Sequence, residues 1–152
     1  MSDTYSYDRL EPIIREKLAM GGTVIIKPKG TSMLPLIRQG IDEVVLKCPD
    51  GRLKKYDIPF YKRKNGQFVL HRIVKVRKND YVLCGDNQTE YEYGIRDDMI
   101  IAVVAEIVRD KKHIKTDNRQ YMKYCRRHVR RQKLKRIYRR LARILLKIRR
   151  KK

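Results

Sequence analysis

The sequence predicts a small antiparallel β-domain, mainly β and barrel-like, with a short helix before it and a basic amphipathic helix after it. The first observation is a series of short runs rich in β-branched and aromatic residues, separated by PDG, KNG, KND and GDN turn signals. Such spacing is typical of strands joined as hairpins in a sandwich or barrel. The runs are TVIIKP, DEVVLKC, DIPFYKR, QFVLHRIVKV, DYVLCGD and MIIAVVAEIV.

The second observation concerns the N-terminal segment. Between residues 7 and 20 the apolar residues Leu10, Ile13, Ile14 and Leu18 recur at helical spacing. The Gly21-Gly22 pair that follows is a natural helix stop. The spacing therefore predicts a short amphipathic helix that ends before the first strand.

The third observation is the uneven distribution of charge. The chain has a net charge of +22, and residues 111–152 hold 20 of its 39 Lys and Arg but one of its 17 acidic residues. We therefore divide the chain into a β-domain with its N-terminal helix, residues 1–110, and a basic helical tail, residues 111–152. At 152 residues the chain is long enough for one modest core.

Several classes of protein are disfavoured by composition. The three cysteines, at positions 48, 84 and 125, form no CxxC pair, so we expect free thiols, no metal site and no cofactor. The N-terminus is polar and acidic, unlike an export signal, and the longest apolar run is far shorter than a membrane span. We expect a cytoplasmic protein, with its tail as a means of peripheral attachment to the inner face of a membrane.

The stretch GTSMLP, residues 30–35, raises the question of catalysis. A lone serine at such a corner usually caps a helical turn, whereas a nucleophilic serine needs a base within hydrogen-bond reach. His113 and His128 lie in the basic tail, but His71 lies on the apolar face of the predicted strand at 67–76. A buried strand histidine is more often structural, so Ser32 and His71 form a candidate pair only if other motifs support it.

Three short motifs supply that support when they are taken in order. They are Gly-x-Ser-Met-x-Pro at 30–35, His-Arg-Ile at 71–73 and Gly-Asp-Asn at 85–87. Together they resemble the signal peptidase family, serine proteases that use a β-domain to cut leader peptides from secreted proteins. The resemblance runs from about residue 24 to residue 109. Histidine at the base position is similar to the Ser-His branch of that family, and differs from the lysine of the related LexA-type repressor peptidases.

The resemblance implies roles for individual residues. Ser32 would be the nucleophile, His71 the general base, and Asp86 the group that orients the imidazole and stabilises its charged form. The residues implied to contact the substrate are Gly30, Met33 and Pro35. A backbone N–H of the serine would contribute to an oxyanion hole, and the peptide would add as a strand beside the edge strand at 23–29. In the Ser-His branch a second acidic residue usually follows Gly-Asp-Asn, so Glu90 and Glu92 remain alternatives to Asp86 as the third member.

The tail carries a pattern of its own. The apolar residues from 134 onward recur at steps of three and four, and almost all the others are basic, which predicts an amphipathic helix. Such a helix can bind an anionic membrane; it can also bind nucleic acid through its charges, or pack on the β-domain. The stripe consists of Leu134, Ile137, Tyr138, Leu141, Ile144, Leu145 and Ile148.

These observations predict a serine endopeptidase that cleaves a leader or precursor peptide through an acyl-enzyme. The alternative is a catalytically inactive relative that binds nucleic acid through a β-domain and a basic arm. The continuity of the apolar stripe favours an anionic membrane surface as the partner of the tail, since nucleic-acid tails need charge but no large apolar face.

Overall fold

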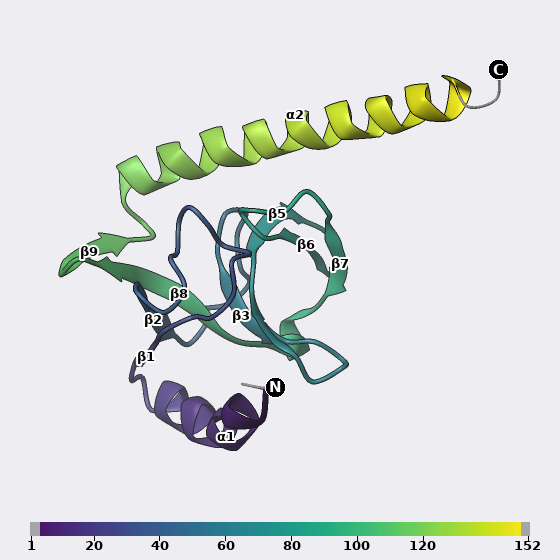
Figure 1. The fold of residues 1–152 in the computed structure, drawn as a ribbon. Coiled ribbons are helices and arrows are strands. Elements are labelled where there is room, and N and C mark those ends of the chain that lie inside the picture. The colour runs from purple at the N-terminus through teal and green to yellow at the C-terminus, as the bar shows by residue number, and fades with distance from the viewer. Residues whose placement is uncertain (1–3, 150–152) are drawn as a thin grey trace.

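The computed structural model describes residues 4–149 and shows antiparallel sheets with a helix at each end of the β-body (Figure 1). Helix α1 spans Thr4–Ala19 and helix α2 spans Arg119–Arg149, which are 16 and 31 residues. The predicted antiparallel strands and both predicted helices are confirmed. The expectation of a mainly β, barrel-like domain is wrong in two respects: the chain is mixed α/β, and its strands form two sheets that do not close into a barrel.

The larger sheet is built around one long central strand. Its strand order is β1 (Val24–Ile26), β2 (Glu43–Lys47), β8 (Ile100–Arg109), β3 (Pro59–Lys62) and β4 (Phe68–Leu70), with β9 (Lys112–Lys115) also paired to β8. The first half of β8 pairs with β3, and its second half lies between β2 and β9. Strands β1 and β4 therefore stand at the two edges of the sheet.

The smaller sheet consists of three strands and meets the larger one at His71. Its order is β5 (Arg72–Val76), β6 (Tyr81–Cys84) and β7 (Glu92–Ile95); a 3₁₀ turn, η1 (Asp97–Met99), then leads into β8. The run at 67–76 is thus two strands and not the single strand that alternation predicts. Strand β4 pairs with β3 in one sheet and β5 pairs with β6 in the other, so His71 lies where the chain passes between them.

Helix α1 packs against one side of the larger sheet. Ile14 and Leu18 are buried in the main core, and the helix stops at Gly21, whose φ of +77° an L side chain rarely adopts. Tyr7 contributes a ring that lies 5.7 Å from Phe60 and 5.6 Å from Phe68, centroid to centroid. This aromatic group fixes α1 beside the edge strand β4.

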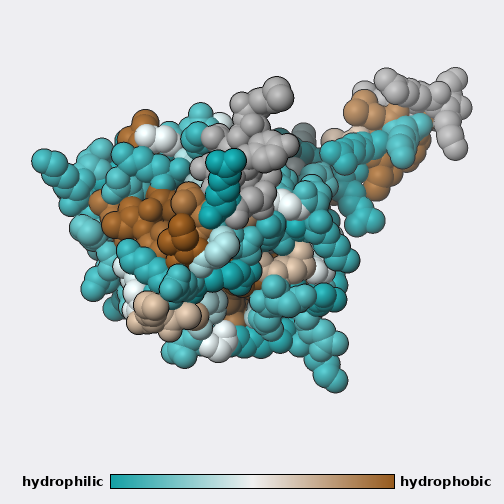
Figure 2. Space-filling view, turned by 90° about the horizontal axis from the view of Figure 1, so that it is seen from below, coloured by the Kyte–Doolittle hydropathy of each residue, from teal (hydrophilic) through white to brown (hydrophobic). Residues whose placement is uncertain are grey.

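Several apolar residues of α1 and of the segment that follows it are exposed. They are Leu10, Ile13, Met20 and Ile25. Figure 2, which views the molecule from below, shows a brown apolar patch on this side of the body.

Ion pairs of the buried Asp42 with two half-buried arginines stabilise the loop that follows Ser32. Asp42 accepts hydrogen bonds from Arg38 and Arg109, and the Arg109 guanidinium also donates to the carbonyl of Leu36 at 2.6 Å. Burial would raise the pKa of Asp42, but the hydrogen bonds from Arg109 and Arg38 outweigh it and hold that pKa well below its usual range.

The segment 111–132 belongs to the body of the molecule. Strand β9 extends the larger sheet, and Asn118 caps α2 by accepting the N–H of Gln120 at 2.8 Å. Tyr121 and Cys125 are buried in the main core, and Val129 packs against a smaller cluster on β5 and β6. The main core therefore includes residues on both sides of position 110.

The second half of α2 extends past the body (Figure 1). The whole predicted apolar stripe, from Leu134 to Ile148, is exposed. Within residues 4–149, neither helix combines the length and the hydrophobicity that a membrane span requires.

Candidate active site

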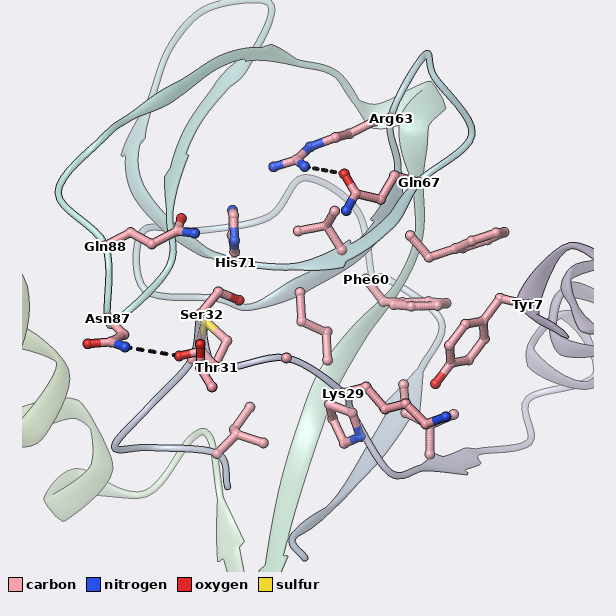
Figure 3. Close-up of a pocket in the computed structure, with 18 residues that line it drawn as sticks. Tyr7, Lys29, Thr31, Ser32, Phe60, Arg63, Gln67, His71, Asn87 and Gln88 are labelled. Carbon is pink, nitrogen blue, oxygen red and sulfur yellow. Dashed lines mark hydrogen bonds between the residues drawn. The ribbon is translucent and has the colours of Figure 1, made fainter. Parts of the chain in front are cut away.

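A cavity of about 520 Å³ lies between the two edges of the larger sheet. Ile26 of β1 and Phe68 of β4 both line it, so the sheet curls until its edge strands face a common space. Figure 3 shows Ser32 and His71 toward one end of the cavity and Tyr7 toward the other. The two residues predicted to carry the chemistry thus line the same cavity.

Ser32 stands on a tight turn that the core anchors. The N–H of Leu34 donates to the carbonyl of Thr31 at 3.2 Å, and the N–H of Ile37 donates to that of Met33 at 2.9 Å. Met33 and Ile37 are buried in the main core, so the turn cannot shift without disturbing them. Gly30 enters the turn with a φ of +89°, a conformation that favours glycine.

The Gly-Asp-Asn turn packs directly on the backbone of the serine. The N–H of Asn87 donates to the carbonyl of Ser32 at 2.8 Å, and its side-chain amide donates to the carbonyl of Thr31 at 3.3 Å (Figure 3). A Cβ placed on Gly85 would lie 2.7 Å from the carbonyl oxygen of Ser32, closer than side-chain carbons approach. The glycine is therefore required for this contact, and the turn holds the serine in place.

His71 is buried, and both neighbours of its Nδ1 atom are hydrogen-bond acceptors. Glu92 Oε2 lies 3.4 Å from Nδ1, and the Tyr61 hydroxyl oxygen lies 3.3 Å from it. Because the tyrosine donates its own proton to Glu92 at 2.7 Å, its oxygen can only accept from the histidine. The neutral imidazole therefore carries its proton on Nδ1, which leaves the lone pair on Nε2 to accept a proton.

Glu92 is held as a carboxylate by Arg63. The guanidinium donates two hydrogen bonds, from Nε to Oε1 at 2.7 Å and from Nη2 to Oε2 at 2.6 Å. Burial would raise the pKa of Glu92, but the hydrogen bonds from His71, Arg63 and Tyr61 outweigh it and the pKa lies well below its usual range. Burial and the bond to the carboxylate raise the pKa of Tyr61, so its hydroxyl stays protonated.

Asp86 has a different partner. Its carboxylate forms two hydrogen bonds with the fully buried guanidinium of Arg72, at 2.8 and 2.7 Å. The same guanidinium donates to the Tyr121 hydroxyl at 3.0 Å and contacts Cys125 Sγ at 2.9 Å. Burial would lower the pKa of Arg72, but the bonds to Asp86 outweigh it and raise that pKa, so the pair is an ion pair.

Helix α2 supports the Gly-Asp-Asn turn from behind. Gln132 Nε2 donates to the carbonyls of Gly85 at 2.6 Å and Gln88 at 2.7 Å, and His128 Nε2 lies 2.9 Å from the carbonyl oxygen of Asp86. The carbonyl of Gly85 also accepts the N–H of Gln88 at 2.9 Å, so the helix adds side-chain donors to a turn that is already hydrogen-bonded internally. The helix is thus connected to Ser32 through one turn of chain.

The predicted site residues fall into three groups. The cavity is lined by Ser32, His71, Gly30 and Met33. Pro35 is exposed and is not among the described residues that line the cavity. Of the three candidate acids, Glu92 contacts the imidazole, Asp86 pairs with Arg72, and Glu90 is an exposed residue 3.8 Å from Arg143.

Sequence reasoning missed the supporting residues Tyr61 and Arg63. They stand two apart on a predicted strand, which places them on one face, but nothing in the sequence indicates that this face meets Glu92 from the other sheet. No group of three or more His, Cys, Asp or Glu side chains in the part of the chain that the structure describes could hold a metal ion.

Comparison with models of protein families, with curated proteins and with solved structures finds no match to this chain. The function must therefore be inferred from the geometry of the site itself.

Proposed function

We propose that this chain is a serine endopeptidase of the signal peptidase type, which cleaves a leader or precursor peptide by acyl-enzyme chemistry. The observation that carries this proposal is the orientation of the His71 imidazole. Its Nδ1 faces the acceptors Glu92 and Tyr61, while the imidazole lines the same cavity as Ser32. A serine, a histidine and a carboxylate that orients the histidine are the groups that activate a hydroxyl nucleophile, and here the serine and the histidine line one cavity.

The reaction follows from this arrangement. Nε2 of His71 accepts the proton of the Ser32 hydroxyl as its oxygen attacks the scissile carbonyl, and Glu92 stabilises the imidazolium that forms. The imidazolium then protonates the leaving amine as the C–N bond breaks, which leaves the acyl group on the serine. Water, activated by the same imidazole, hydrolyses the ester and restores the free hydroxyl.

The edges of the larger sheet offer a place for an extended peptide. Strands β1 and β4 each pair on one side within the sheet, and both line the cavity, so a peptide strand inserted between them can bond to backbone on either side. Apolar walls from Phe60, Phe68 and Ile37 favour apolar side chains on that peptide. We therefore propose an extended peptide with apolar residues on the acyl side of the cleaved bond as the substrate.

A peptide library analysed by mass spectrometry tests the proposal. The wild-type protein should produce defined cleavage products that disappear with Ser32→Ala. Thr31→Ala removes a neighbouring hydroxyl from the same turn and should retain cleavage. Products that persist at the wild-type rate in Ser32→Ala would exclude this serine as the nucleophile.

A further inference from the structure

The two sides of α2 have different relations to the body. At about 100° per residue, the residues that contact the body project from one side of the helix, and the exposed apolar stripe projects from roughly the opposite side. The buried residues on the body side are Tyr121, Cys125, Val129 and Gln132. The stripe therefore points away from the body.

Contacts of the second half of the helix confirm this orientation. Arg136 lies with its guanidinium carbon 3.9 Å from the centre of the Tyr91 ring, and Arg139 donates to the Thr89 hydroxyl at 2.9 Å. Both arginines project from the body side. Thr89 and Tyr91 thus contact the body side of this part of α2, and the apolar stripe lies on the opposite side of the helix.

The outward face of α2 is continuous along the helix. Its first half consists of exposed bases for which no acidic partner is seen among the described residues, and its second half is the apolar stripe. The bases are Lys123, Arg126, Arg127, Arg130 and Arg131. The stripe consists of Leu134, Ile137, Tyr138, Leu141, Ile144, Leu145 and Ile148.

We propose that the outward face of α2 binds an anionic lipid surface as an interfacial helix, with the β-body on the side away from the lipid. The apolar half enters the boundary between headgroups and acyl chains, and the basic half lies against anionic headgroups. A nucleic acid would match the bases but would leave the stripe exposed. A second copy of the chain would cover the stripe but would bring like charges together. The lipid surface satisfies both halves.

Binding of the full-length protein to vesicles tests the orientation, because the chain offers two adjacent leucines on different sides. Leu145 belongs to the stripe and is 63% exposed, whereas Leu146 is 59% exposed and projects toward the body side of the helix. Leu145→Ser should weaken binding to phosphatidylcholine vesicles that contain phosphatidylglycerol by about tenfold. Leu146→Ser, the matched control, should change it by less than about twofold.

The double variant Leu141→Ser/Leu145→Ser should weaken binding by about a hundredfold while the melting temperature stays that of the wild type. Vesicles of phosphatidylcholine alone should bind weakly, and added salt should weaken binding to the anionic ones. Equal losses for Leu145→Ser and Leu146→Ser would overturn the proposed orientation.

Two other results would overturn the proposal as a whole. The first is binding to a single-stranded RNA that the double variant leaves unchanged, together with no preference for anionic vesicles. The second is a dimer in lipid-free solution that the double variant dissociates, as measured by sedimentation. Neither measurement depends on peptidase activity.

Discussion

Replacing Glu92 by glutamine should reduce catalysis without unfolding the protein. The amide has the size of the carboxylate and keeps one oxygen that can accept from Tyr61 or His71. It loses the negative charge that stabilises the imidazolium in the transition state, so the loss should fall on kcat and leave KM almost unchanged.

The structure sets the size of this loss. The carboxylate oxygen lies 3.4 Å from Nδ1 of His71, a separation at which two unit charges interact by about 5 kcal/mol at an effective dielectric constant of about 20. The amide oxygen of the glutamine can still accept a hydrogen bond, and such a neutral bond is about half as strong as one to a carboxylate, so roughly half of this is retained. About 2–3 kcal/mol is lost, so kcat should fall by roughly 30- to 150-fold.

Asp86→Asn is the informative comparison. It leaves the fully buried guanidinium of Arg72 without its counter-ion, which should cost about 3–5 kcal/mol of stability. Urea unfolding and the rate of peptide cleavage, measured side by side, separate the two effects. Glu92→Gln should lose rate more than stability, and Asp86→Asn the reverse. A folded Glu92→Gln with the wild-type kcat would refute the role of this carboxylate.

Four further predictions concern the same site and its support. Ser32→Ala and His71→Ala should each remove nearly all cleavage, and the double variant should be scarcely slower than either, because the two act as a unit. Gly85→Ala should slow cleavage in a protein whose circular dichroism is unchanged, since its Cβ would displace the carbonyl of Ser32. Gln132→Ala should cost about 0.5–1.5 kcal/mol in urea unfolding and slow cleavage, because the carbonyls of Gly85 and Gln88 lose the side-chain donor that ties their turn to α2. For Asp42, whose pKa is depressed in the folded state, the stabilising effect is present above its ordinary pKa of 3.8; the difference in unfolding free energy between wild type and Asp42→Asn should therefore stay constant from neutral pH to about 5 and shrink below about 4.

The strands with clear turn signals were predictable from sequence, and two short strands were not. Strand β7 reads as a polar segment, Glu92–Ile95, and β9 lies in the basic segment Lys112–Lys115. Each becomes a strand because a neighbouring strand supplies its hydrogen bonds, which is a tertiary effect that local pattern cannot register. The run at 67–76 divides into β4 and β5 at His71 for the same reason. The two strands pair with partners in different sheets, which the alternation of residues along the run does not reveal.

That Ser32 and His71 lie on one cavity was predictable from the sequence, whereas the acidic residue that faces His71 was not. The order of the motifs identifies Ser32 and His71 as candidates, and both residues line one cavity in the structure. Which acidic residue orients His71 depends on which carboxylate faces its Nδ1 atom. Asp86 does not, because its carboxylate forms hydrogen bonds with Arg72. Charge likewise divides the chain at residue 110, but the buried residues beyond it, such as Gln132, stand among bases that conceal them in composition.

The most direct test of the central claim is labelling of the full-length protein with a serine-reactive phosphonate, followed by mass spectrometry of its peptides. The account predicts one phosphonylated residue, Ser32, with labelling that His71→Ala abolishes and Thr31→Ala preserves. A protein that stays unlabelled, or that is labelled equally well after His71→Ala, would contradict the proposal that this histidine activates the serine.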